Sequence, residues 1–111
     1  MQRAIPSHLW VSALVRRAET AGAFAMIVHK GDADRGDVLV KVTTARGQAR
    51  LYGPAFDPDG AGDFEALQPA DEGGVDALIA KRLKSDRDLW VVEIEDRQGR
   101  HFLTERVRGE R

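Results

Sequence analysis

Three histidines, His8, His29 and His101, are the side chains of this 111-residue chain best suited to metal or acid–base chemistry. They lie in different parts of the chain, and no two of them have the i, i+4 spacing with which a helix presents paired metal ligands. The chain contains no cysteine, which excludes disulfides, zinc sites built on thiolates and catalysis by a thiol. We therefore predict no metal site and no cofactor.

An aspartate-rich segment from Asp57 to Asp63 is similar to the start of a calcium-binding loop. Such a loop needs an oxygen ligand at its fifth position and a bidentate glutamate at its twelfth. Counted from Asp57, those positions hold Ala61 and Gln68, and no helical pattern precedes the segment. The composition is that of an ordinary surface loop, so no calcium site is predicted.

Nucleophilic and phosphate-binding motifs are missing from the sequence as well. None of Ser7, Ser12 and Ser85 lies in a Gly-x-Ser-x-Gly setting, and no partner base can be assigned to them. Gly31 and Gly36 bracket a turn that lacks the Lys-Ser/Thr pair of a phosphate-binding loop. The sequence thus assigns no catalytic residue, and it favours a non-enzymatic protein.

The charge balance argues against nucleic-acid binding. The 17 Lys and Arg residues are matched by 18 Asp and Glu, for a formal net charge of -1. Tyr52 is the aromatic side chain best placed to stack on a base, but Glu93 and Glu95 would repel phosphate from the same sheet. A local basic patch could form from Arg16, Arg17, Lys30, Arg46 and Arg50. Weak nucleic-acid binding is therefore kept as the third of three functional hypotheses.

Hydrophobic periodicity predicts two helices and five strands to hold these side chains. A first helix is predicted over Leu9–Ala21, with Ser7 as its N-cap and Gly22 as a left-handed C-cap glycine. The second is predicted over Val75–Lys84. Strands are predicted over 24–30, 38–43, 48–52, Leu89–Glu95 and 101–105, and a long Pro/Gly/Asp-rich surface loop over 54–74.

The order of these elements, α-β-β-β-α-β-β, predicts one compact α+β domain over residues 1–111. Short polar turns join the first three strands, and a parallel crossover needs a dozen or more residues, so an antiparallel meander is predicted. We expect an antiparallel sheet of four to five strands with both helices packed on one face. The other face of the sheet is then open to solvent.

Alternation along the strands places one set of side chains on this open face. The apolar residues at 38, 40, 42, 90, 92 and 94 are predicted to face the helices. The predicted interaction surface on the outward face is Lys41, Arg50, Tyr52, Val91, Glu93 and Glu95. Thr43, His29 and the aliphatic residues Leu39 and Ile27 are expected on the same face. A mixed apolar and charged face suits docking, so the leading hypothesis is an interaction module that binds a protein partner, including a second copy of itself. The alternative is a solvated face with cross-strand ion pairs worth ~0.2–1 kcal/mol each.

The 54–74 loop supports a second hypothesis. A structureless loop of about twenty residues is uncommon in a small domain, and such loops are usually functional or mobile. A cleft between this loop and the sheet edge would bind a small molecule or support a minor enzymatic activity.

The chain is expected to be cytoplasmic and to have no membrane contact. No apolar run approaches the ~20 residues needed to cross a bilayer. The first seven residues contain one arginine and lack the apolar region of a secretory signal.

Several stretches together resemble a small bacterial family known as domain of unknown function 1491. They are Trp10–Ala18, Gly22–Ala25, Val38–Val42, Ala49–Pro54 and Asp88–Arg97. The likeness covers nearly the whole chain except the 55–74 loop. It implies a single compact cytoplasmic domain, and it implies no catalytic, cofactor-binding or ligand-binding residue.

Overall fold

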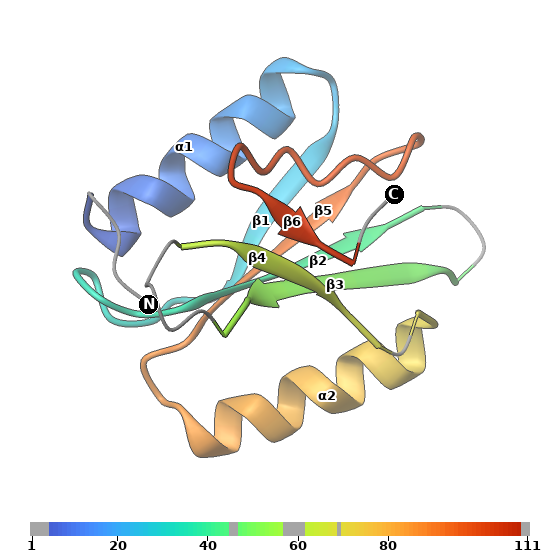
Figure 1. Cartoon of the computed structure of the whole chain (residues 1–111). Helices are drawn as coiled ribbons and strands as arrows, with labels where there is room; N and C mark the ends of the chain where they lie inside the picture. The colour runs from blue at the N-terminus through green and yellow to red at the C-terminus, as the bar shows by residue number, and fades with distance from the viewer. Residues whose placement is uncertain (1–4, 45–46, 57–61, 69, 110–111) are drawn as a thin grey trace.

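The computed structural model describes residues 5–44, 47–56, 62–68 and 70–109, which form a six-stranded mixed sheet between two helices (Figure 1). The predicted α+β class with two helices is confirmed. The elements in chain order are α1 (Ser7–Thr20), β1 (Phe24–His29), β2 (Val38–Thr43), β3 (Ala49–Pro54), β4 (Phe64–Leu67), α2 (Glu72–Ser85), β5 (Trp90–Glu95) and β6 (Val107–Arg108). Within the described residues, no helix is long and apolar enough to span a membrane.

The strand order is β1-β5-β2-β3-β4-β6, so the predicted antiparallel meander of four to five strands is wrong. β5 lies between β1 and β2, antiparallel to the first and parallel to the second. The short β1–β2 connection does force opposite strand directions, but it leaves room for a strand between them. It crosses the start of β5, where the indole N–H of Trp90 donates to the carbonyl of Asp32 at 2.7 Å. Gly36 is required there because a Cβ would collide with the carbonyl of Asp88.

The two helices pack on opposite faces of the sheet, which corrects the prediction that both cover one face (Figure 1). β2 shows why, since all six of its residues are buried. Val38, Val40 and Val42 pack in the cluster that contains α1, and Leu39 packs in the cluster that contains Val75 of α2. A strand with both faces covered is typical of a sheet between two helical layers.

α1 forms where the periodicity predicts it, and its end is confirmed in detail. Gly22 has a φ of 91°, and the N–H of Ala23 donates to the carbonyl of Ala18 at 2.9 Å, which is the pattern of a Schellman motif. The predicted cap at the start is wrong. Ser7 lies inside the helix after Pro6, and its buried hydroxyl donates to the carbonyl of Gly36 at 2.7 Å.

The predicted 54–74 loop contains a strand and the start of a helix. β4 pairs antiparallel with β3, and Phe64 is fully buried, stacked on Trp10 with ring centroids 5.4 Å apart. α2 starts three residues before the predicted Val75, because the Asp71 carboxylate caps it by accepting from the N–H of Gly74 at 2.9 Å. Most of the calcium-like segment, residues 57–61, lies outside the described residues.

The predicted terminal hairpin at 101–105 is absent from the described structure, and the chain forms β6 instead, parallel to β4. Phe102 explains the departure, since its φ of 61° is a left-handed conformation that a strand cannot contain. The guanidinium of Arg17 holds this residue in place by donating to the Phe102 carbonyl at 2.9 and 3.0 Å. The segment therefore runs across the end of α1 before it reaches β4.

Candidate functional site

The six residues predicted to share one sheet face are divided between two faces. The register of β2 and β3 pairs Lys41 with Leu51 and Val42 with Arg50. Arg50 therefore shares the α1 face with Val42, and Tyr52 packs on that face too. The others, Lys41, Val91, Glu93 and Glu95, lie on the α2 face. A single shared face is thus wrong, because alternation within a strand does not define its register with the next strand.

Three of the six residues expected to face solvent are buried. Lys41 and Val91 are 5% and 1% exposed, and Val91 packs in one cluster with Ile79 of α2. Tyr52 is buried on the other side of the sheet, edge-on to His101 with ring centroids 4.9 Å apart. The sequence predicted a sheet face with no helix over it. At these three positions the side chains are buried, so that open face does not exist there.

Lys41 is held beneath α2 by three carboxylates. Its Nζ lies 2.9 Å from Glu72, 2.7 Å from Asp76 and 3.7 Å from Glu93. Burial opposes the charged form, but the hydrogen bonds that Lys41 donates to Asp76 and Glu72 and the charge of Glu93 outweigh it, so the pKa of Lys41 is raised above its ordinary value. The ammonium therefore stays charged and ties α2 to the sheet.

The remaining part of the α2 face is open. α2 packs mainly against β2 and β3 and reaches β5 at Val91, so it does not cover the far end of β5 or the side chains of β1 on this face. Glu95 is exposed and Glu93 half-buried, as the sequence predicts. The β1–β5 register sets Phe24 beside Glu95 and Met26 beside Glu93. Of the six predicted surface residues, the two that remain accessible on this face are therefore the glutamates next to the edge strand.

β1 is the outermost strand at this end of the sheet and pairs with β5 alone among the described strands. It presents four large apolar side chains that are about half exposed: Phe24 at 56%, Met26 at 46%, Ile27 at 45% and Val28 at 53%. Residues 23–28 contain no charged side chain. A bulge between Ile27 and His29 ends the regular ladder, so Phe24 to Ile27 form the regular part of the edge.

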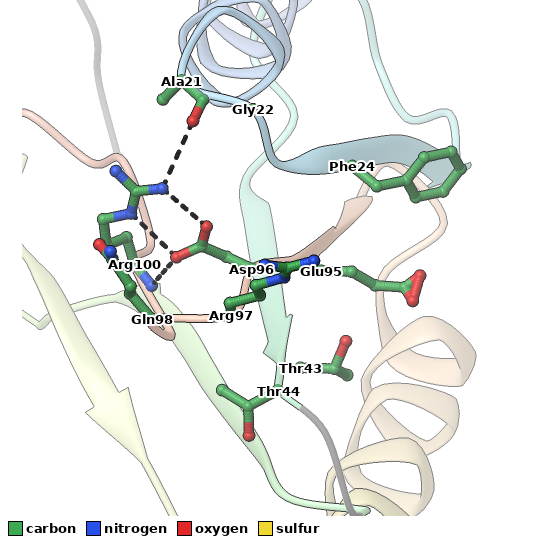
Figure 2. Close-up of a pocket in the computed structure, with 10 residues that line it drawn as sticks. All are labelled: Ala21, Gly22, Phe24, Thr43, Thr44, Glu95, Asp96, Arg97, Gln98 and Arg100. Carbon is green, nitrogen blue, oxygen red and sulfur yellow. Dashed lines mark hydrogen bonds and ion pairs between the residues drawn. The ribbon is translucent and has the colours of Figure 1, made fainter.

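A shallow cleft of about 640 Å³ adjoins the start of β1 (Figure 2). Its walls come from the end of α1, the ends of β2 and β5 and the turn that follows β5. Figure 2 shows Glu95 and Phe24 extending toward one side and Asp96 pointing back to Arg100. The lining residues are Ala21, Gly22, Phe24, Thr43, Thr44, Glu95, Asp96, Arg97, Gln98 and Arg100. This cleft, unlike the one predicted beside the 54–74 loop, draws on no residue of that loop.

Asp96 and Arg100 form a clamp in the cleft wall. The Arg100 guanidinium donates to both oxygens of Asp96, at 3.0 and 2.9 Å, and the Arg100 backbone N–H donates to it at 2.8 Å. Arg100 also donates to the carbonyl of Ala21 at 3.5 Å, and it lies over the Phe102 ring. These hydrogen bonds lower the pKa of Asp96 to about 2. Both groups are therefore committed to each other, and the clamp closes the turn rather than activating a nucleophile.

The histidines and basic residues do not converge on a site. His8 is exposed on α1, and Nδ1 of His29 lies 2.7 Å from the carbonyl oxygen of Leu89. In the described part of the chain, no cluster of His, Asp or Glu could hold a metal ion. The hypothetical basic patch loses Arg17 to the Phe102 carbonyl, and Arg46 lies outside the described residues. Since Tyr52 is buried, it cannot serve as a base-stacking platform.

Phe24, Met26 and Val28 are surface residues that sequence reasoning missed, whereas Ile27 is exposed as the sequence analysis expected. The signal was present, because the segment is a short apolar run without a charge. Such a run is also typical of a buried strand, and only the position of β1 at the end of the sheet distinguishes the two.

Comparison with known proteins gives a consistent picture of the chain's relatives. The sequence profile of a family described as "Protein of unknown function (DUF1491)" matches residues 5–104. A crystal structure of a DUF1491 family protein from Caulobacter crescentus CB15 is 48% identical, with a TM-score of 0.87 over 93% of this chain and 98% of that one. An NMR structure of a DUF1491 family protein from the same organism is 45% identical, with a TM-score of 0.89 over 97% and 100%. A solution structure from A. tumefaciens is 32% identical, with a TM-score of 0.80 over 98% and 100%. No curated protein matches the sequence significantly.

Proposed function

This chain belongs to the DUF1491 family, whose function is unknown, and we propose from its structure that it binds a protein partner by adding an extended segment of that partner to the edge of β1. The observation that carries the proposal is the uncharged, apolar character of an unpaired edge strand. Such an edge presents a row of N–H and C=O groups that can pair with another chain. Strand addition of this kind is a recurring mode of peptide recognition, in which main-chain bonds give affinity and side-chain contacts give specificity.

The apolar side chains on β1 supply the second part of the binding energy. Phe24 and Met26 lie on the α2 face, and Ile27 lies on the α1 face opposite Val92. A partner strand would place its own side chains about 5 Å from these, close enough for cross-strand pairs worth roughly 0.2–1 kcal/mol each. A strand of six residues makes an interface smaller than the roughly 1,200 Å² of standard complexes, so we expect transient binding.

The test uses a fluorescently labelled peptide of about eight residues that alternates Val and Thr, a pattern that fits an added strand. We expect its anisotropy to rise with added protein, and the rise to be lost in Phe24→Lys and Met26→Lys, because each variant places a charge on the edge. The matched control is Phe56→Lys, which changes an aromatic residue that is 83% exposed in the segment after β3. Binding should survive this change.

Two outcomes would overturn the proposal. The first is binding that is equally strong in Met26→Lys and in the unmodified chain. The second is no rise in anisotropy at any protein concentration up to about 1 mM, the weak limit of a useful interaction. Size-exclusion chromatography with light scattering covers the self-association alternative. A dimer that Met26→Lys dissociates would keep the β1 site but replace the separate partner with a second copy, which contradicts the proposal.

A further inference from the structure

We infer that the segment bound at β1 alternates apolar residues with lysine or arginine, an inference that rests on the proposed function. The inference is based on Glu93 and Glu95, which form an acidic row on β5, the strand next to the edge strand β1. Glu95 stands next to Phe24 and Glu93 next to Met26 on the neighbouring strand β5. Both glutamates lie on the α2 face, where Glu95 is exposed and Glu93 is half-buried.

This face has more carboxylates than cations. Lys41, one strand further in, already contacts Glu72 and Asp76 of α2 at 2.9 and 2.7 Å, and it reaches Glu93 only at 3.7 Å. Arg97 is a second basic side chain near the row and lines the adjoining cleft. Among these described residues, the four carboxylates of Glu72, Asp76, Glu93 and Glu95 outnumber the two cations, and Glu93 and Glu95 are the ones next to the edge strand.

A basic side chain on an added strand can reach this row. Neighbouring strands are about 4.8 Å apart, so the added strand lies about 10 Å from β5, with β1 between them. The stem of a lysine or arginine can lie along the exposed Phe24 or Met26 while its charged end extends toward Glu95 or Glu93. The apolar edge and the acidic row thus act on the same side chain of the partner.

A second copy of the chain supplies no such complement. The regular part of the edge, Phe24 to Ile27, contains no basic residue, so pairing two such segments would bring only apolar side chains to the acidic row. It would also place the two acidic rows about 14 Å apart, where like charges repel weakly and are largely screened at physiological salt. Charge complementarity therefore favours a different, basic partner over self-association.

The experiment compares three labelled peptides of about eight residues, alternating Val with Lys, Thr or Glu. At roughly 25 mM salt, where screening is weak, we expect the Val-Lys peptide to bind at least tenfold more tightly than the Val-Thr peptide. The Val-Glu peptide should bind most weakly. In the double variant Glu93→Gln/Glu95→Gln, the Val-Lys affinity should fall to that of Val-Thr, while the Val-Thr affinity stays unchanged.

The matched control is Glu19→Gln/Asp34→Asn, which removes two exposed carboxylates, one from α1 on the other face of the sheet and one from the β1–β2 connection at the start of β5, the end opposite Glu93 and Glu95. It should keep the tenfold preference; loss of the preference here would show bulk attraction and overturn the inference. Equal binding of Val-Lys and Val-Thr would overturn the inference and leave the proposed function standing. Binding of Val-Lys that Met26→Lys does not weaken would overturn both.

Discussion

The two edges of the sheet are built in opposite ways. β1 is six residues long, uncharged from Phe24 to Val28, and about half exposed at four apolar side chains. β6 is two residues long, and Arg108 in it pairs with Asp63 at 3.0 Å. Short strands and charged side chains are the means by which proteins prevent edge-to-edge association. One end of the sheet is therefore protected and the other is left able to pair.

A phenylalanine near each edge shows the same difference. Phe64 starts β4, pairs with Val107 of β6 and is fully buried against Trp10. Phe24 starts β1 and is 56% exposed. The same residue type is core at one end and surface at the other, which indicates that the two ends were not built for the same purpose. Three measurements test this difference between the β1 and β6 edges of the sheet.

The largest expected effect separates the two phenylalanines. Phe64→Ala removes a buried aromatic ring and should lower the free energy of unfolding by about 3–5 kcal/mol. Phe24→Ala should lower it by less than about 1 kcal/mol, because the ring is already half in water. Urea or guanidinium unfolding followed by Trp fluorescence gives both values. An equal loss of unfolding free energy in the two variants would show that Phe24 belongs to the core as much as Phe64 does, and would contradict the difference between the two edges.

The clamp beside the β1 edge should make a smaller, pH-dependent contribution. Asp96→Asn should cost about 1–3 kcal/mol near pH 7, since it removes a charge-assisted hydrogen bond from Arg100. The folded pKa of Asp96, about 2, lies below the ordinary value of 3.8, so this stability is present above pH 4 and is lost as the pH falls toward 2. Unfolding midpoints of both proteins at pH 6 and pH 2.5 test the sign. If the difference in stability between the two proteins were larger at pH 2.5 than at pH 6, the predicted sign would be wrong.

The smallest expected effect concerns Lys41. Lys41→Met removes the ammonium, but the carboxylates of Glu72 and Asp76 are about half exposed and keep their contact with water, so the free energy of unfolding should fall by only about 1 kcal/mol. The same variant leaves Glu93 without its cation, so it should strengthen binding of the Val-Lys peptide and not that of Val-Thr. Parallel anisotropy titrations show the change. A weaker Val-Lys affinity would mean that the acidic row does not attract the partner.

The spacing of apolar residues along the chain was sufficient to predict most of the helices and strands. Helical spacing over Leu9–Ala21 and alternation over 38–43 and Leu89–Glu95 all mark real helices and strands, and Gly22 ends α1 as expected. These features depend on residues a few positions apart, so they are visible in the sequence. β4 was missed because four residues within a polar segment are too few to show a period.

Long-range arrangement could not be predicted in the same way. Nothing near residues 24–42 shows that β5 lies between β1 and β2, and the register of β2 with β3 decides on which face Arg50 lies. The run Val38-Leu39-Val40 does indicate burial on both faces, a signal of two helical layers. The candidate site depends on which strand is outermost, so only its two glutamates and Ile27 were expected at the surface.

The insertion of β5 also governs how the chain can fold as it leaves the ribosome. β1 and β2 are made early, yet neither has its shared neighbour until Trp90–Glu95 emerges. Until then the sheet surface on which α1 packs is incomplete, and β1 and β2 lack the strand that pairs with both of them. A sheet that closes through such distant residues has a high contact order, which slows folding. We expect ribosome-bound chains that end before residue 90 to remain sensitive to protease and to need protection from premature association.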